Sequence, residues 1–424
     1  MALTQRQQLA LNRSTARINL WYGSVRSAKT YGQVHDFIAR MTMWTGEGIN
    51  LIVGHSTNTV WRNIFQPIVT RPEFKAIAPH LRYRQNAPTG TLFGKPFNVV
   101  GANNEASWLA IQGLTVENAW GDEAAGWPLS FWDMLVSRLS LPQSRLLVTC
   151  NPSTANHYLK QKVVDKQHTD PDVHVEKFLL QENTTLSQGY IDMVSRQYSG
   201  LFYRRMILAE WVAAEGAVYE GWNPDTMVVD ELPELLQTVS FGVDYGTTHP
   251  TAGHALSLGR TTEAGPDGVL RPVTRLYLHN EFNPNPGKKR ATDAQLADML
   301  QTHLATLPHQ PRYMYADPAA ASFREELHSR GVLTHRADNH VVDGIRTIDS
   351  LLMNDQLKIH ADCTQLIAEM SEYRWDEKAA QRGEDKPVKE NDDFVDGARY
   401  AVHSSRHLWR PLLTAPAPPA LSTM

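Results

Sequence analysis

A possible phosphate-binding loop is the first feature of this sequence that could do chemistry. Residues 18–30 read INLWYGSVRSAKT, so an apolar run leads into a glycine, and a Lys-Thr pair follows after five intervening residues. This is close to G-x-x-x-x-G-K-[ST], in which backbone N–H groups hold phosphates at a helix N-terminus. We expect Lys29 to reach the β- and γ-phosphates and Thr30 to hold Mg²⁺. The other expected ATP-binding residues of the loop are Gly23, Ser27 and Ala28.

Two residues of this loop have roles that the pattern leaves open. Ala28 stands where the pattern has its second glycine, and its Cβ would crowd the loop if that position needs a positive φ. Arg26 is either a solvated surface residue or an arginine that reaches the γ-phosphate in the transition state.

A P-loop enzyme also needs acidic residues near its phosphates, and residues 114–123 (LTVENAWGDE) supply a pair. Asp122 would hold the magnesium shell and Glu123 would polarise the attacking water. Residues 146–153 (LLVTCNPS) end an apolar run in Thr149 and Asn151, and α/β sheets bind ligands at this edge of their strands. An Asn-Pro turn is the alternative interpretation of that segment.

Four aspartates in the second half of the chain form another constellation. Asp244 lies inside a strand-like run (SFGVDYG), although strands disfavour aspartate, and Asp317 ends another (RYMYAD). Asp393 and Asp396 are spaced to lie one helical turn apart. Carboxylates suit Mg²⁺ or Mn²⁺, and two ions about 4 Å apart can cleave a phosphodiester. The set of three acids, Asp244, Asp317 and Asp396, is typical of an RNase H-like nuclease with these residues as metal ligands.

The elements that would position these residues suggest two domains. Residues 1–213 alternate strand-like runs (51–55, 145–150) with helical patterns (31–41), which favours a parallel α/β sheet. Residues 239–410 start with strand-like runs at 240–246, 274–282 and 312–317, and helices are predicted at 341–353 and 364–374. We expect a linker at 214–238, a hairpin loop at 259–272 and a flexible tail rich in Pro and Ala at 411–424.

Composition limits the class of protein. The 424 residues are 42% hydrophobic and 20% charged with a net charge of −4, which excludes a histone-like protein that coats DNA by bulk charge. Two cysteines cannot form a disulfide framework, and the 17 histidines show no H-E-x-x-H or Cys/His spacing. The chain has no signal-peptide pattern and no apolar run of membrane length. We therefore expect a soluble protein of a reducing, cytoplasmic compartment.

Taken together, these motifs resemble the large terminase subunit of tailed bacteriophages over roughly residues 5–405. YGSVRSAKT is similar to the family's Walker A loop, WGDEAAGWP to its Walker B segment and VTCNPSTANHYLK to its coupling segment, with Asn151 as sensor of nucleotide state. FGVDYG, YADPA and DDFVDGARY are similar to its nuclease motifs. The family often has histidine where this chain has Asp393, and this departure offers Asp393 as an extra acid of the metal shell. Gln7 or Gln8 occupies the place of its adenine-contacting glutamine, and we assign Gln8 as the candidate.

The resemblance implies an ASCE-type P-loop ATPase domain joined to an RNase H-like nuclease domain. It implies a motor that packages double-stranded viral DNA with ATP and Mg²⁺, in which Arg26 completes the ATPase site in cis and Mn²⁺ can replace Mg²⁺ in the nuclease site. The implied partners are the small terminase subunit, the portal protein and further copies in a ring, usually a pentamer, in the host cell cytoplasm.

Two other classes of protein remain open at this point. One is an RNase H-like integrase, resolvase or repair nuclease with a vestigial P-loop, which would cut DNA without DNA-stimulated ATPase activity. The other is a non-enzymatic scaffold that binds the portal or capsid, with both sites decayed. The substitution of Ala28 for glycine favours these alternatives, and the intact acidic residues argue against the scaffold.

Overall fold

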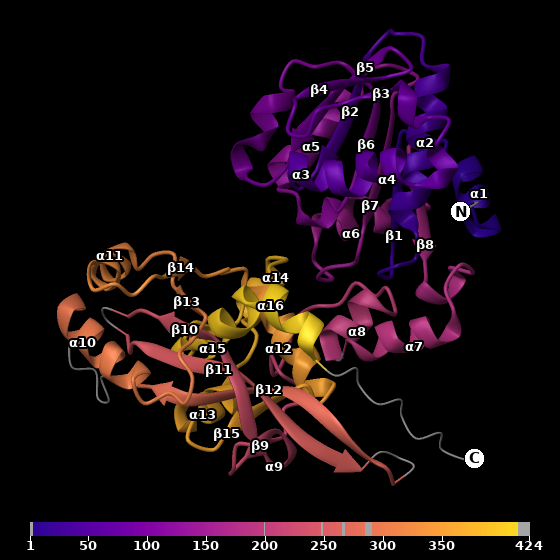
Figure 1. Cartoon of the computed structure of the whole chain (residues 1–424). Coiled ribbons are helices and arrows are strands. Elements are labelled where there is room, and N and C mark those ends of the chain that lie inside the picture. The colour runs from indigo at the N-terminus through magenta and orange to yellow at the C-terminus, as the bar shows by residue number, and fades with distance from the viewer. Residues whose placement is uncertain (1–2, 199, 247–248, 265–267, 285–290, 414–424) are drawn as a thin grey trace. The chain divides into compact units, whose positions relative to one another are not determined.

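The computed structural model describes residues 3–198, 200–246, 249–264, 268–284 and 291–413. The chain divides into two compact units (Figure 1). Unit 1 contains the residues up to Ser195, Leu201–Ala213 and Ala380–Glu384, and unit 2 contains Arg196–Gly200, Ala214–Ala379 and the residues from Asp385 onward. The main boundary between the two units falls after Ala213. The sequence did not predict that Arg196–Gly200 belongs to unit 2 and Ala380–Glu384 to unit 1.

Unit 1 is built on an eight-stranded sheet with the order β3-β4-β5-β2-β6-β7-β1-β8. The strands from β5 to β8 in this order are parallel, and β3 and β4 extend the edge as antiparallel strands. Strand β7 therefore separates β1 from β6, so the segments that follow these three strands meet at one edge of the sheet. The strands are β1 (Ile18–Gly23), β2 (Ile49–Gly54), β3 (Leu81–Arg82), β4 (Thr89–Leu92), β5 (Lys95–Gly101), β6 (Val116–Gly121), β7 (Arg145–Cys150) and β8 (Val173–Phe178).

Hydrophobic cores cover both faces of this sheet because the side chains of a strand alternate between its faces. Trp21, Ile52 and Trp120 belong to one buried cluster, while their neighbours Leu20, Leu51 and Ala119 belong to the other. Helices lie along the sheet in Figure 1. They are α1 (Gln5–Arg13), α2 (Lys29–Met43), α3 (Thr57–Val60), α4 (Gln66–Thr70), α5 (Leu129–Arg138), α6 (Tyr158–Lys162), α7 (Gln188–Arg196) and α8 (Gly200–Met206).

Unit 2 contains a seven-stranded mixed sheet with the order β14-β13-β10-β11-β12-β15-β9. The central strands β10, β11 and β12 form an antiparallel meander, and β13 and β15 join it as parallel strands on opposite sides. The strands are β9 (Val228–Val229), β10 (Glu234–Asp244), β11 (Ala252–Ala264), β12 (Leu270–Phe282), β13 (Tyr313–Ala316), β14 (His335–Arg336) and β15 (Leu357–His360).

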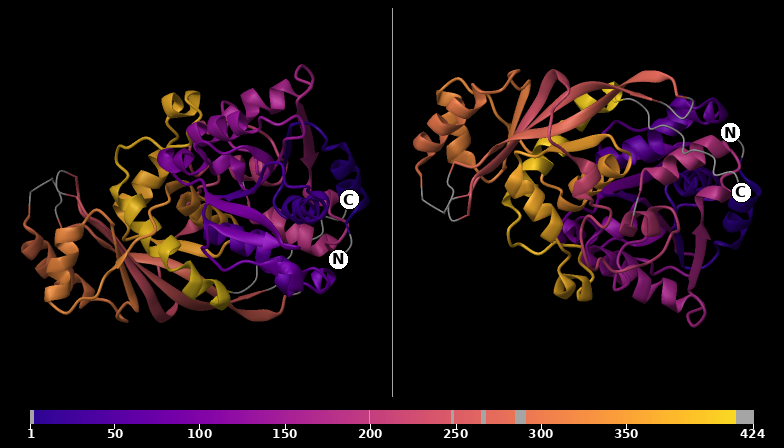
Figure 2. Two further views of the ribbon diagram at one scale, coloured as in Figure 1. Left: turned by 90° about the horizontal axis from the view of Figure 1, so that it is seen from above. Right: turned by 90° about the horizontal axis from the view of Figure 1, so that it is seen from below.

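Helices pack on both faces of the second sheet. Helices α10 (Asp293–Leu304) and α11 (Ala321–Ser329) cover Phe241 and Val243, and they lie side by side in Figures 1 and 2. Helix α15 (Asp393–Ser404) covers the opposite face at Gly242, where a Cβ would lie 2.3 Å from the Ala401 nitrogen. The remaining helices are α9 (Pro224–Met227), α12 (Val341–Met353), α13 (Thr364–Glu372), α14 (Glu377–Gln381) and α16 (Arg406–Trp409).

Three connecting segments differ from the prediction or lie outside the described part. The segment 214–238, expected as a linker, contributes β9 and the first residues of β10, because β9 pairs with β15 and completes the sheet edge. The hairpin loop predicted at 259–272 is shorter, because β11 and β12 stay paired up to Ala264 and Leu270. Of the predicted tail, residues 414–424 lie outside the described residues.

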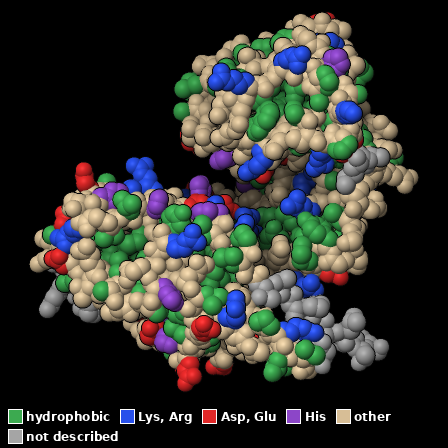
Figure 3. All heavy atoms as spheres, viewed as in Figure 1, with side chains coloured by type: hydrophobic (Ala, Val, Ile, Leu, Met, Phe, Trp, Pro, Cys, Tyr) green, Lys and Arg blue, Asp and Glu red, His purple; other side chains and the backbone are tan. Residues whose placement is uncertain are grey.

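The surface agrees with the near-neutral composition. On the face of each unit drawn in Figure 3, Lys and Arg side chains stand in small groups among polar and apolar ones, without a continuous basic surface. Within the described ranges, no helix has the length and apolar character needed to cross a membrane.

Candidate active sites

The loop after β1 has the compact shape that phosphate binding requires. A Cβ at Gly23 would lie 1.9 Å from the carbonyl oxygen of Phe178, so only glycine fits beside β8. Arg26 (φ 58°) and Ala28 (φ 63°) both adopt left-handed backbone conformations. Ala28 is also the N-cap of α2, which starts at Lys29. The strain that the sequence indicated at Ala28 is therefore present.

Replacing Ala28 with glycine should raise the free energy of unfolding of unit 1 by about 1 kcal/mol. Glycine adopts a positive φ without the steric cost that alanine has there. Chemical denaturation followed by tryptophan fluorescence would measure the change. The control is Ala106→Gly at an exposed position of a 3₁₀ turn, where we expect a loss of stability instead. A loss of stability in Ala28→Gly would contradict the assigned strain.

Lys29 is buried against the carbonyl oxygens of its own loop. Its ammonium donates to the carbonyl oxygens of Ser24 at 2.7 Å and Gly23 at 3.1 Å, and to the Ser27 hydroxyl at 3.3 Å. Only 8% of Lys29 is exposed, and this burial lowers the pKa of its ammonium to about 8. A triphosphate in the loop would offer this cation stronger acceptors than neutral carbonyl groups.

Asp122, which is 4% exposed, is the centre of a polar network at the ends of three strands. Its Oδ1 accepts hydrogen bonds from the hydroxyls of Thr30 (2.8 Å) and Thr149 (2.6 Å). Its Oδ2 accepts from the amide of Asn63 at 2.8 Å. These contacts join α2, β7 and the segment after β2 to the end of β6. A carboxylate bonded to the first hydroxyl of α2 is the arrangement expected of a magnesium-shell acid in a P-loop site.

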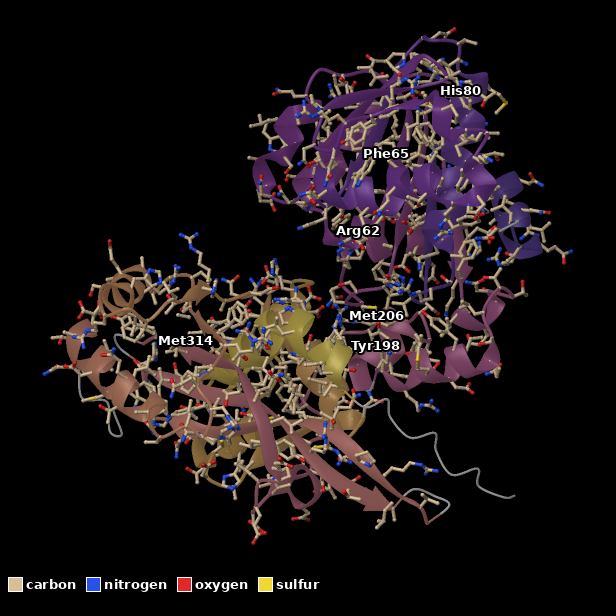
Figure 4. The ribbon with its side chains drawn as sticks, viewed as in Figure 1. Arg62, Phe65, His80, Tyr198, Met206 and Met314 are labelled. Carbon is tan, nitrogen blue, oxygen red and sulfur yellow. The ribbon has the colours of Figure 1, made fainter. Side chains whose placement is uncertain are left out.

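Asn63 was not predicted, because nothing in its surroundings marks it. It lies in a π-helical turn, Trp61–Phe65, between α3 and α4. Figure 4 shows how this turn divides its side chains: Phe65 lies inside the unit and Arg62 lies at its surface. Arg62 donates through Nε to the Asn63 Oδ1 at 3.1 Å, which leaves the Asn63 amide nitrogen directed at Asp122. Single π turns of this kind are frequent at functional sites.

Two further side chains contact the loop from other elements. Asn151, just after β7, donates to the carbonyl oxygen of Gly23 at 2.6 Å. Gln7 of α1, which is buried, donates to the carbonyl oxygen of Ala28 at 2.8 Å. Gln8, the residue assigned from the sequence, is exposed and donates to the Leu3 carbonyl oxygen, so Gln7 and not Gln8 contacts the loop.

The two expected catalytic groups of unit 1 are both on its surface. Glu123 follows Asp122 directly, is exposed and has a left-handed backbone (φ 58°), which turns the chain sharply after β6. Arg26 is exposed, and its guanidinium makes no hydrogen bond or ion pair with the described residues. Asn183 holds the Arg26 backbone by donating to its carbonyl oxygen at 2.8 Å. The loop is thus fixed while the Arg26 side chain is available.

The four acids of unit 2 come from three elements that meet at one end of its sheet. Asp244 is the last residue of β10, and Asp317 follows the neighbouring strand β13, to which β10 is paired. The Asp317 N–H donates to the Val243 carbonyl oxygen at 3.1 Å. Asp393 and Asp396 lie in the first turn of α15, which packs across β10. The predicted acids therefore converge.

The closeness of these four carboxyl groups affects the pKa of Asp244. Burial, together with the carboxylates of Asp396, Asp317 and Asp393, raises the pKa of Asp244 to about 8, and Arg399 opposes this shift. Repelling carboxylates in a partly dry site are the donor set that hard divalent cations bind. The residues present thus fit Mg²⁺ or Mn²⁺.

Metal-free Asp244→Asn should be more stable than the wild type, with a difference that grows with pH. The unfolded Asp244 loses its proton near pH 4 and the folded one only near pH 8, so stability falls between these values and is constant above them. Asparagine carries no such penalty. Melting in EDTA should show the variant several degrees higher at pH 9 and nearly equal at pH 4. Saturating Mg²⁺ should reverse the order, and a pH-independent difference would contradict the shift.

Two buried groups that sequence reasoning missed hold α15 in place. Glu369 of α13 accepts from the backbone N–H groups of Phe394 (2.8 Å) and Val395 (2.9 Å), so it caps the first turn of α15. Arg399, which is fully buried, pairs with Asp396 at 2.7 Å. Burial raises the pKa of Glu369 to about 8. Its position on the apolar face of the predicted helix 364–374 is the signal that could have identified it.

Two family models match parts of this chain. A family model described as phage terminase large subunit matches residues 15–206, and one described as terminase RNaseH-like domain matches residues 286–405. The chain belongs to the phage terminase large subunits. The models cover the P-loop, Asp122 and Asn151 in one unit and Asp317, Asp393 and Asp396 in the other.

Solved structures extend this similarity over nearly the whole terminase chain. The large terminase of a thermophilic bacteriophage is 28% identical with a TM-score of 0.83, covering 95% of this chain and 99% of that one. That protein has also been solved with ADP and with ATP-γ-S, at TM-scores of 0.83 and 0.81. The mixed α/β fold with an ATPase and an RNase H-like unit is thereby confirmed.

A curated relative is more distant. The terminase large subunit of Escherichia phage T5 is 23% identical over 281 residues, which are 63% of this terminase chain and 59% of that protein. The chain thus matches less than two thirds of the length of that relative.

Proposed function

We propose that this chain is the subunit of a viral DNA-packaging motor. Unit 1 hydrolyses ATP to translocate double-stranded DNA into a procapsid, and unit 2 cuts concatemeric DNA. The observation that carries the proposal is the contact of Thr30, Thr149 and Asn63 with the Asp122 carboxylate, in a chain whose other unit gathers four aspartates. An intact ATPase site in the same chain as an intact acidic cluster favours a motor over a nuclease with a vestigial P-loop.

In the proposed ATPase reaction each group acts where its surroundings favour it. Lys29 exchanges the loop carbonyls for the β- and γ-phosphates, and Thr30 and Asp122 hold Mg²⁺. Glu123 accepts a proton from the attacking water. Arg26 reaches the γ-phosphate in cis, for which its exposed guanidinium is suited. Gln7, rather than Gln8, is the candidate for contact with the adenine.

Asn151 is the proposed sensor of the nucleotide. Its amide bonds to the Gly23 carbonyl oxygen at the start of the loop, so a change of loop conformation on phosphate release alters this bond directly. Asn151 continues from β7, the strand between β1 and β6, and can transmit the change to the residues that follow it.

In the proposed nuclease reaction, Asp244, Asp317 and Asp396 hold two divalent cations and Asp393 adds a further carboxylate to their shell. The ions supply Lewis-acid chemistry, activating water and stabilising the leaving oxygen of a phosphodiester. Arg399 holds the Asp396 carboxylate in place through their 2.7 Å ion pair. Mg²⁺ is the proposed cofactor, and Mn²⁺ can replace it in this site.

The proposed partners follow from this role. They are double-stranded viral DNA, a small terminase subunit, a portal protein and further copies of this chain, in a pentameric ring when docked. The proposed site of action is the host cell cytoplasm.

The decisive test compares wild type and Lys29→Ala in ATP hydrolysis, with and without linear double-stranded DNA. We expect DNA-stimulated turnover in the wild type and its loss, by at least about 100-fold, in Lys29→Ala, because the buried ammonium is the cation placed to bind the phosphates. Lys75→Ala, at an exposed position of unit 1, is the control and should keep full turnover. Plasmid cutting without any ATPase activity would support the nuclease with a vestigial P-loop. Absence of both activities would support the scaffold.

A further inference from the structure

A third group of metal-binding side chains lies in unit 2, apart from the four aspartates. His254 of β11, Glu281 of β12 and Cys363 at the N-cap of α13 come together beside a bulge in the sheet. The pairing of β11 with β12 shifts register between Gly253 and Ala255, and Asn280 opposite has a positive φ of 56°. The bulge turns His254 and Glu281 toward the same side.

The three side chains offer one ligand atom each, and these atoms all lie within 4.8 Å of one another. His254 Nε2 and Glu281 Oε2 are 3.5 Å apart. Tetrahedral zinc with bonds of about 2.0–2.3 Å places its ligand atoms roughly 3.3–3.8 Å apart. The distance between the ligand atoms of His254 and Glu281 thus already fits a zinc tetrahedron. Shifts of about 1 Å would bring the distances from the Cys363 sulfur to these two atoms into the same range.

The unpartnered ring nitrogens of His254 independently indicate a bound ligand at this position. Its side chain is 0% exposed, and neither ring nitrogen has a hydrogen-bond partner among the described residues. The Glu281 carboxylate, with 7% of its side chain exposed, lies too far away for a hydrogen bond. A buried imidazole with two unsatisfied nitrogens is costly, and a metal ion would satisfy one of them.

The remaining two ligands are suitably held. Glu281 accepts from the backbone N–H groups of Leu366 (2.9 Å) and Gln365 (3.2 Å), which orients its carboxylate and still leaves lone pairs for an ion. Cys363 is fully buried at the N-cap of α13, where its Sγ lies 3.4 Å from the Asp362 Oδ1, and it would bind the ion as a thiolate after loss of its proton.

We propose that His254, Glu281 and Cys363 bind one divalent transition-metal ion of the zinc class, in a structural site distinct from the nuclease centre. A nitrogen, a carboxylate oxygen and a thiolate are ligands that zinc accepts together, whereas Mg²⁺ avoids sulfur. Water fills the fourth position. The two kinds of site therefore select different metals.

The site would connect the sheet to α13 and, through α13, to α15, which carries two of the nuclease acids. The ion joins β11 and β12 to the start of α13, and Glu369 near the other end of α13 caps α15. His254 also contacts Phe394 of α15, with ring centroids 6.0 Å apart. Bound metal would thus stabilise α13 and α15 without touching the reacting atoms.

Cobalt titration of the full-length, chelator-treated protein tests the proposal with a signal that only a thiolate site gives. We expect one equivalent of Co²⁺ to produce a thiolate-to-metal charge-transfer band in the near ultraviolet, which Zn²⁺ displaces. The chain has two cysteines, so the band can be assigned. Cys363→Ser should abolish it. Cys150→Ser is the matched control, because Cys150 is also buried and free but belongs to unit 1, and it should keep the band. Asp396→Asn should keep it as well.

Absence of the band in the wild type, its loss in Cys150→Ser or its survival in Cys363→Ser would each overturn the proposal. If Cys363→Ser does not fold, X-ray absorption at the zinc edge of the loaded wild type decides instead. One sulfur ligand together with lighter ligands is expected, and a spectrum without sulfur would overturn the proposal.

Discussion

Replacing Glu123 with glutamine is expected to lower ATP turnover by roughly 10²–10⁴-fold while leaving ATP binding and metal-dependent DNA cutting unchanged. Glutamine has the shape of glutamate but cannot accept the proton of the attacking water. Glu123 is exposed at the turn after β6, so the exchange does not disturb the Asp122 network. Steady-state phosphate release, nucleotide affinity and plasmid nicking in Mn²⁺ measure the three quantities.

The affinity measurement separates this variant from Lys29→Ala. Loss of the Lys29 ammonium removes a phosphate contact and should weaken ATP binding, whereas Glu123→Gln should bind ATP as well as the wild type and fail only at the chemical step. Glu47→Gln, at an exposed position bonded to Gln143, is the control with full turnover. If Glu123→Gln lost cutting to the same extent as hydrolysis, the assignment of two separate sites would be wrong.

Local patterns in the sequence predicted the elements that carry the chemistry. The helix expected at 341–353 and the strand expected at 145–150 have those bounds in the structure. The apolar residues of the helix recur with a helical period, and the strand is a short apolar run buried in the sheet of unit 1. Asp244 could be identified because aspartate is unfavourable inside a strand. In the structure, this aspartate belongs to the group of carboxylates that forms the candidate metal site.

A local pattern in the sequence distinguishes the position of Gln7 from that of Gln8. Thr4 and Gln7 form a capping box at the start of α1, in which each side chain bonds to the backbone of the other residue. This contact fixes Gln7 on the inner face of the helix, and its free amide then reaches the Ala28 carbonyl oxygen. The T-x-x-Q spacing could have indicated Gln7.

Other site residues could not be predicted, because their roles depend on contacts between distant segments. Asn63 reaches Asp122 only because a π turn re-aims it, and no local pattern marks such a turn. His254, Glu281 and Cys363 are far apart in sequence and have no metal-binding spacing. A register shift between two strands brings the first two together, and registers of this kind are set by tertiary packing.

Asp244→Asn is expected to reduce metal-dependent DNA cutting by at least about 100-fold and to leave DNA-stimulated ATP hydrolysis intact. Removing one shared carboxylate costs several kcal/mol of metal and transition-state stabilisation, and each 1.4 kcal/mol corresponds to about tenfold in rate. Asparagine keeps the shape at the end of β10, so α15 should remain packed on the strand. Conversion of supercoiled plasmid to nicked and linear forms, in Mg²⁺ and in Mn²⁺, measures the loss.

The control for this variant is Asp230→Asn, at an exposed position of the same unit, which should cut like the wild type. A second comparison excludes general damage: metal-free Asp244→Asn should melt above the wild type at high pH, since it lacks a buried charge that Asp396 and Asp317 repel. A variant that is more stable than the wild type and does not cut DNA is still folded and has lost only the catalytic step. Cutting that persisted in Asp244→Asn would place the nuclease centre elsewhere in the chain.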